Sequence, residues 1–430
     1  MEARAVPEGS KLFPRLASLA LAFLVTLYAL AVIIKIAREP QHFQHSFCTY
    51  YVAAQAFNQG MHPYHIEELQ RVQPNIKGET YSYPPITLYF FLPFTALPYY
   101  PAYLVYLAFK AVCLVFLIAI WQKWILKRKL DGLFLLLCLI GFNFAVYWDL
   151  SAGCISLFVL LLLWAGLLAY LRDHLHVFAV LVALAASFHL SLVLFLALLV
   201  LRRGRSRWYP MLLGAGVFLG LSALSSVFYS EMTIGFLQNV RASIPGLGMG
   251  RTLYESYPPA SWPLIREVLE RVYARAGIVG AAESFSIVAY LALVMLVLLA
   301  TWVAVRRLRP ASRSNGYLTA VMLFSLAYLI VMPKLTVASY VLVLPAAYFV
   351  ALKTKAVNAL LVLLGVMAVS TSPCRPPVFN MLLDILPLYY PLLLTGVLWC
   401  AAVYICLRPD SLPTQETKSP GAGSAPCAGN

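Results

Sequence analysis

A few ionisable residues stand inside or beside apolar stretches, where their chemistry could be used. Asp149 lies between two apolar runs in an uncharged neighbourhood, and Glu79 comes two residues before Tyr81 in a tyrosine-rich segment. A carboxylate in such a place could act as a general base and take the proton of an attacking hydroxyl group. Asp149 could equally be a solvated residue that caps the next helix, and Glu79 a solvated loop residue. His45 is the next base to consider if neither carboxylate acts.

Three further side chains could bind an anion or line a polar cavity. Lys334 lies between two apolar runs. If these runs cross a membrane with the orientation given below, Lys334 is on the side where positive charge is disfavoured, so it could be there to hold a phosphate group. It could also extend to lipid headgroups without a specific ligand. Arg251 follows a glycine-rich turn that could approach an anion, and His189 could line a cavity or be an ordinary interior histidine.

The composition predicts that membrane helices position these residues. Of the 430 residues, 62% are hydrophobic and 11% are charged, whereas a soluble domain has roughly half and a quarter. Several uncharged stretches approach or exceed the roughly 20 residues that cross a bilayer as a helix. A soluble globule is therefore excluded. We predict an all-α, polytopic integral membrane protein with about 10 to 13 transmembrane or re-entrant helices.

The distribution of charge predicts the orientation of the chain. The net charge is +15, but the excess of Lys and Arg lies in short loops between apolar runs, so nucleic-acid binding is not indicated. The two longest loops, 35–84 and 231–284, contain equal numbers of basic and acidic residues. Because cytosolic loops carry the positive excess, both long loops are expected outside the cytosol. Both termini are expected in the cytosol.

The chain reads as one membrane domain with two tails. Residues 1–15 are expected to form a cytosolic tail, residues 16–407 a single multi-spanning domain, and residues 408–430 a disordered cytosolic tail rich in Ser, Pro and Gly. The predicted crossings are Leu16–Ile34, Pro101–Trp121, Leu133–Trp148, Gly153–Leu171, Met211–Tyr229, Phe285–Val305, Leu318–Met332, Leu335–Leu352, Ala356–Thr371 and Leu388–Leu407.

Two segments fit a single crossing poorly. Prolines interrupt the apolar stretch that contains Ile86–Leu97, which predicts a short or re-entrant helix there. The segments on both sides of Val177–Leu201 are basic and are expected on the cytosolic side, whereas a single crossing would place them on opposite sides of the membrane. Two short helices that meet near His189 would return the chain to the cytosolic side. Such a break at membrane depth is tolerated only where protein or a wet cavity covers it.

The first outer loop contains a predicted helix with an unusual density of tyrosine and histidine around it. Tyr50, Ala53, Ala54 and Phe57 fall on one helical stripe that ends near Gly60. Aromatic residues at this level normally form the interfacial belt of a membrane protein. The belt explains most of these residues but not the accompanying histidines.

The second outer loop contains a predicted amphipathic helix. Ser261 is placed as its N-cap, and an apolar face runs from Leu264 to Val272. Ion pairs four residues apart are expected on its polar face. This helix should lie on the outer membrane surface, where it could shelter the mouth of a cavity or act as a passive lid.

Cysteine and sequon usage give little sign of metal or glycan chemistry. The eight cysteines include no CxxC pair and show no metal-ligand spacing. No Asn-x-Ser/Thr sequon occurs, which favours a bacterial inner membrane over a lumenal location. No cofactor and no metal ligand set is indicated, although the sequence leaves a metal requirement open.

The run YYVAAQAFNQGMHPY, followed by YSYPP and FLPFTALP, resembles the start of glycosyltransferase family 87. Later segments that keep the likeness are DLSAGCISLF, ALAASFHLSLVLF and MPKLTVASYVLVLPAAY. The resemblance implies a multi-spanning C-type glycosyltransferase fold and a polyprenol-phosphate-mannose-dependent mannosyltransferase activity. We predict a substrate site to which Tyr50, Tyr51 and Tyr83 of these motifs contribute, together with Lys334, Arg251 and His189.

Three positions depart from the pattern of that family. The resemblance implies a catalytic Asp immediately before Phe47, which leads into Tyr50-Tyr51. In this chain the residue at that position is Ser46. The resemblance also implies a Gln or Asn directly after Gly153, but this chain has Cys154 there. It implies a Lys in the pair of short helices, where this chain has His189.

We therefore predict a membrane glycosyltransferase that moves a sugar, mannose by resemblance, from a polyprenyl-phosphate donor to an extracytoplasmic acceptor. Its partners would be membrane lipids, the lipid-linked donor, and a glycan or glycolipid acceptor. The alternative, which Ser46 favours, is a catalytically degenerate protein that binds, flips or helps to assemble lipid-linked sugars. A solute transporter ranks third, because the spans contain few charged residues and no internal repeat is evident.

Overall fold

The fold is helical throughout the residues that the computed structural model describes. These are residues 12–39, 42–74, 81–129, 131–202, 208–243, 260–275, 282–308, 313–370 and 386–407. Within these ranges no residue lies in a β-strand. The predicted all-α class is confirmed.

Six helices of the described chain are long and apolar enough to cross a membrane. They are α1 (Leu12–Arg38), α5 (Tyr99–Ala119, extended by the π-helix η4, Ile120–Ile125), α6 (Gly132–Ala152), α9 (Trp208–Phe228), α12 (Ala282–Leu308) and α16 (Leu386–Leu407). Most apolar side chains of α1, α9 and α12 are exposed, as expected of helices that face lipid rather than water. The protein is a polytopic integral membrane protein.

Shorter apolar helices complete the bundle. They are α7 (Ser156–Leu171), α8 (Leu175–Phe188), the 3₁₀-helix η5 (Leu190–Leu201), α13 (Arg313–Val331), the 3₁₀-helix η8 (Val337–Val343), α14 (Leu344–Lys353) and α15 (Val357–Ser370). The predicted pair of short helices is confirmed, because α8 and η5 meet at His189. Arg202, just after η5, is ion-paired with Asp173, just before α8, so both ends of this hairpin lie together.

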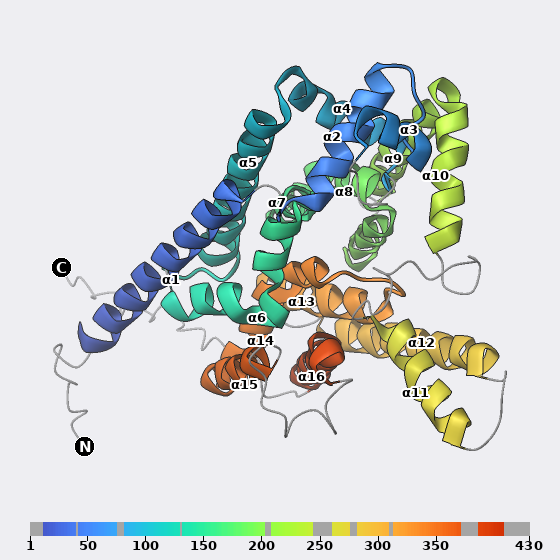
Figure 1. Cartoon of the computed structure of the whole chain (residues 1–430). Helices are drawn as coiled ribbons and strands as arrows, with labels where there is room; N and C mark the ends of the chain where they lie inside the picture. The colour runs from blue at the N-terminus through green and yellow to red at the C-terminus, as the bar shows by residue number, and fades with distance from the viewer. Residues whose placement is uncertain are drawn as a thin grey trace, which may run out of the picture.

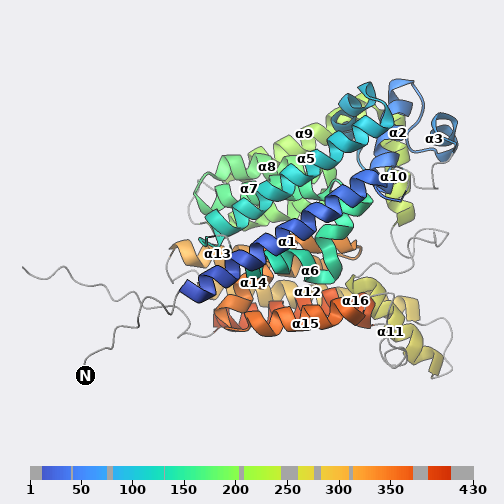
Figure 2. The same ribbon diagram turned by 60° about the vertical axis from the view of Figure 1, so that its left-hand side comes forward.

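The helices of the two long loops gather at one end of the bundle, which we call the outer-loop end. They are α2 (His45–Asn58), α3 (Ile66–Val72), α10 (Ser230–Ser243) and α11 (Ser261–Arg275). Figure 2 shows all four on the side away from the start of α1, and Figure 1 shows α10 beside α2 and α3. α10, which the sequence did not predict, packs its Gly235 against His62 and Tyr64 of the first loop.

Two predicted helices form short apolar helical segments, Pro85–Ala96 and Val337–Lys353, whose geometry changes between 3₁₀ and α along their length. The predicted crossing Leu335–Leu352 consists of η8 and α14, and Ile86–Leu97 consists of η2 (Pro85–Thr87), α4 (Leu88–Phe91) and η3 (Leu92–Ala96). Both segments contain proline, which removes a backbone donor and favours shorter helical pieces.

α6 is interrupted in the middle, contrary to the prediction of one continuous crossing. Phe142, Asn143 and Phe144 have positive φ angles of 51° to 62°. The ring of Phe142 is fully buried and stacks on Tyr340 at 5.7 Å. We attribute the break to this packing, because strained backbone persists only where its surroundings hold it.

The predicted amphipathic helix of the second loop is confirmed as α11, with one correction. Its polar face carries the expected ion pairs, Arg266 to Glu270 at 2.7 Å and Arg271 to Glu267 at 2.6 Å. Ser261 is not an N-cap: the helix begins at this residue, and its hydroxyl donates to the carbonyl of Ile330 at 2.8 Å. The hydroxyl of Ser261 is therefore bonded to α13 and not to the first turn of its own helix.

The arrangement predicts the accessibility of the two ends. Gln70 in α3 and Lys355 in the link between α14 and α15 are both exposed. Figure 2 shows α3 at the outer-loop end and α14 toward the end where α1 begins. We expect Gln70→Cys to react with a membrane-impermeant thiol reagent added outside intact cells, and Lys355→Cys to react only after the cells are opened. Labelling is measured above that of the parent protein. The reverse pattern would invert the proposed orientation.

Candidate functional site

The end of α6 is held by groups from two other segments. The carbonyl of Asp149 accepts a hydrogen bond from the ammonium group of Lys110 in α5. The carbonyl of Leu150 accepts from the side-chain amide of Gln44 at 2.6 Å, and that of Ser151 from the backbone N–H of Gln44 at 2.6 Å. Carbonyls in the last turn of a helix lack intrahelical partners. Gln44 supplies the partners of Leu150 and Ser151 here, and Lys110 adds a bond to the carbonyl of Asp149, which also accepts the N–H of Gly153 at 3.1 Å.

A close backbone contact fixes the start of α2 against this end of α6. Gln44, the residue before α2, is fully buried and has a φ angle of 62°. Gly153, the residue after α6, has a φ angle of 74°. A Cβ atom at position 153 would lie 2.8 Å from Oε1 and 3.0 Å from Cα of Gln44. Only glycine accommodates both this φ angle and this contact at low cost.

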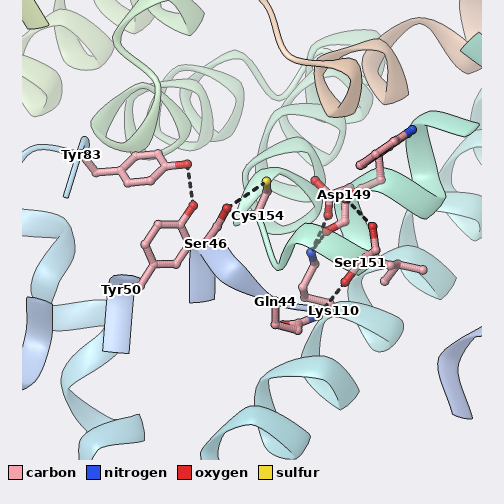
Figure 3. Close-up of polar contacts among 10 residues, drawn as sticks. Gln44, Ser46, Tyr50, Tyr83, Lys110, Asp149, Ser151 and Cys154 are labelled. Atoms are coloured by element: carbon pink, nitrogen blue, oxygen red, sulfur yellow. Dashed lines mark hydrogen bonds and ion pairs between the residues drawn. The ribbon is translucent and has the colours of Figure 1, made fainter. Parts of the chain in front are cut away.

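Lys110 and Asp149 form a buried ion pair beside this contact (Figure 3). Lys110 Nζ lies 2.7 Å from Asp149 Oδ1, and the two side chains are 1% and 0% exposed. The interpretation of Asp149 as a solvated helix cap is therefore wrong. Lys110 was missed at the sequence level, although a single lysine inside an apolar crossing was the available signal.

Ser46 and Cys154 meet next to the ion pair (Figure 3). Ser46 Oγ, in the first turn of α2, lies 3.6 Å from Cys154 Sγ, in the link between α6 and α7. Both residues are half-buried. These are the positions at which the resemblance implied a carboxylate and an amide. The structure brings the two positions together and places a neutral hydroxyl and a thiol there.

Aromatic hydroxyls and a histidine form the neighbouring part of the site. The hydroxyls of Tyr50 and Tyr83 are hydrogen-bonded at 3.0 Å, and the ring of Tyr83 lies edge-on to His189 at 5.5 Å. Tyr64 donates to the carbonyl of Tyr83 at 2.5 Å. Burial, with Tyr83 beside it, raises the pKa of Tyr50 well above its ordinary value. Tyr50 therefore remains a neutral hydrogen-bonding phenol at physiological pH.

The remaining predicted site residues occupy other places. Tyr51 turns its hydroxyl to the carbonyl of Leu97 at 2.8 Å, so the structure gives it a packing role beside η3. His45 is half-buried at the start of α2, next to Ser46, and Lys334 is exposed in the turn between α13 and η8. Glu79 and Arg251 lie outside the described residues. In the described part of the chain, no group of His, Cys, Asp and Glu could hold a metal ion.

The described chain forms an apolar helical bundle, and an ion pair, tyrosines and a histidine lie beneath its outer loops. This arrangement defines an integral membrane protein with a buried polar site. The sequence model of glycosyltransferase family 87 matches residues 81–333, which is more than half of the chain. The protein belongs to glycosyltransferase family 87. The matched region contains Tyr83, Lys110, Asp149 and His189. No curated protein and no solved structure matches the chain significantly.

The contact between Gly153 and Gln44 predicts a clear difference between two glycine substitutions. We expect Gly153→Ala to destabilise the protein by about 1 to 3 kcal/mol, because it strains the backbone and displaces Gln44. Gly216→Ala is the control, since a Cβ at Gly216 in α9 meets nothing within 4 Å. Thermal unfolding of the purified proteins in one detergent measures both. Equal midpoints would show that the contact is not structurally important.

The ion pair predicts that single and double substitutions behave differently. Lys110→Met should lower stability by about 3 to 5 kcal/mol, because it leaves Asp149 charged and unpaired in the interior. Lys110→Met combined with Asp149→Leu should recover much of that loss. The measurement is the thermal midpoint in detergent. Additive destabilisation by the two changes would contradict a mutually compensating pair.

Proposed function

We propose that this protein is a glycosyltransferase that moves a sugar from a polyprenyl-phosphate donor to an acceptor at the outer-loop end. The observation that carries this proposal is the convergence of the start of α2 with the link between α6 and α7, directly beside the Lys110–Asp149 pair. Family membership supports the reaction class. Mannose as the sugar rests on the resemblance, and a glycan or glycolipid is the proposed acceptor.

The reaction needs a base for the acceptor hydroxyl and a means of holding the donor phosphate. The acceptor oxygen forms a bond to the anomeric carbon, while the bond from that carbon to the phosphate oxygen breaks and the phosphate leaves with the electron pair. We propose Asp149 as the group that takes the acceptor proton. Its ammonium partner, Lys110, opposes the effect of burial, which disfavours the ionised carboxylate. His45 and Glu79 are the alternatives.

The other predicted residues have distinct proposed tasks. Lys334 and Arg251 would hold the donor phosphate, since charge-assisted hydrogen bonds suit a phosphate group. Tyr50, Tyr83 and His189 would hydrogen-bond the sugar. The charge bias supports a site that faces away from the cytosol, with both termini in the cytosol, and the lack of sequons supports a bacterial inner membrane.

A specific observation supports a second function. Ser46 occupies the position of the carboxylate implied by the resemblance, and its partner Cys154 is also uncharged. Asp149 is fully buried and engaged with Lys110, so it must be released before it can reach an acceptor. A protein that binds, flips or helps to assemble lipid-linked sugars without transferring them fits this arrangement.

One assay tests both functions. Purified protein in lipid is given a radiolabelled polyprenyl-phosphate mannose donor and a lipid extract as acceptor, and both transfer and donor binding are measured. We expect wild type to transfer sugar. The Lys110→Met/Asp149→Asn variant should lose at least about 100-fold in transfer but keep donor binding, because an amide cannot act as a base. This double variant avoids the uncompensated ammonium that Asp149→Asn alone would leave.

The other outcomes separate the alternatives. Donor binding without transfer by wild type would favour the degenerate function, above all if Ser46→Asp introduced transfer. Full activity of the double variant would exclude Asp149 as the base and make His45→Gln and Glu79→Gln the next variants to measure.

A further inference from the structure

The end of α5 opposite the outer loops changes from α-helix to π-helix over Ile120–Ile125. The amide of Leu126 donates to the carbonyl of Trp121 at 2.8 Å, five residues back. Trp121 is fully buried and meets Trp164 of α7 edge-on at 6.1 Å, whereas Trp124 is 37% exposed. Single π-helical turns occur frequently at functional sites. Here the turn presents one tryptophan to the core and the other to the surroundings.

Two cations from different helices meet at the exposed indole ring. Lys123 Nζ lies 5.8 Å from the ring centroid of Trp124, and Arg172 Cζ, at the end of α7, lies 5.9 Å from it. Both cations are exposed. Each gains a cation–π interaction from the indole. Neither charge is neutralised by that contact, so the positive potentials of the two groups add at this place.

The acidic residues near these cations are engaged elsewhere. Asp173 follows Arg172 directly but is ion-paired with Arg202. Asp131 is ion-paired with Arg128 at 3.1 Å and accepts the hydroxyl of Tyr348 at 2.5 Å. Among the described residues, these are the two acids at this end of the bundle. Lys123 and Arg172 therefore form a site for an anion that the described part of the chain does not supply.

We propose that Lys123, Trp124 and Arg172 bind the phosphate headgroup of an anionic lipid. The ligand must be negatively charged, and it must lie at the level where the apolar surfaces of α5 and α7 end. A phospholipid headgroup satisfies both conditions, and basic groups between transmembrane helices on the cytosolic side suit such headgroups. The amphipathic indole of Trp124 is suited to the same interfacial level. This site is at the opposite end of the bundle from the polar site of Asp149 and does not depend on the proposed transfer activity.

The test compares two charge-matched double variants by native mass spectrometry. Detergent-solubilised protein is titrated with phosphatidylglycerol and, separately, with phosphatidylcholine of the same acyl chains. Lys123→Gln/Arg172→Gln should raise the Kd for phosphatidylglycerol by about tenfold or more, since each cation near a lipid headgroup is worth about 1 kcal/mol. Lys353→Gln/Lys355→Gln is the control. It removes two exposed positive charges from the same end, where Lys353 lies over the ring of Phe349 at 5.8 Å.

Each outcome of the titrations either supports or overturns the headgroup site. A selective loss in the first variant, with unchanged Kd for phosphatidylcholine and an unchanged thermal midpoint, supports the headgroup site. Equal losses in the two variants would reduce the effect to general positive charge and overturn the proposal. No loss in either variant would also overturn it. Displacement of phosphatidylglycerol by inorganic phosphate at about millimolar concentration would identify a site for free phosphate instead of a lipid.

Discussion

The capping of the last carbonyls of α6 is the interaction on which the polar site depends. Without Gln44, the carbonyls of Leu150 and Ser151 would be unpaired in an apolar environment, where an unsatisfied polar group costs several kcal/mol. The carbonyl of Asp149 also accepts the N–H of Gly153. Lys110 supplies one partner from a neighbouring span, and Gln44 supplies two from the first outer loop. The same contacts therefore join α5, α6 and the start of α2. The position of Ser46, two residues after Gln44, follows from this attachment.

The buried charges are tied to that capping arrangement. The ammonium group of Lys110 contacts both the carbonyl and the carboxylate of Asp149, so the helix end and the ion pair share one cation. Burying an isolated charge in the interior costs too much free energy. A buried ion pair inside a membrane protein therefore indicates a functional site. Glutamine or methionine at position 110 could fill similar space. Neither would hold a carboxylate ionised beside the end of a helix.

Much of the helical fold could be predicted from the sequence, because the length of an apolar run indicates a membrane-spanning helix. The stripe of Tyr50 and the ion pairs of α11 are local patterns, and both predictions are confirmed. The break in α6 was not predicted, since it depends on the packing of Phe142 on a distant helix. Asp149 was recognised by its uncharged surroundings. Its partner Lys110 was not, because the two are 39 residues apart and no local pattern joins them.

Serine at position 46, where the resemblance implies a carboxylate, is consistent with the charge already present in the site. Figure 3 shows the Ser46–Cys154 contact beside the Lys110–Asp149 pair, so the two belong to one polar cluster. A carboxylate at position 46 would add a second negative charge to a cluster that holds one cation, Lys110. With serine there, Asp149 and Lys110 balance each other. If transfer occurs, the charge of its base must come from the existing pair, and the release of Asp149 from Lys110 becomes part of the reaction.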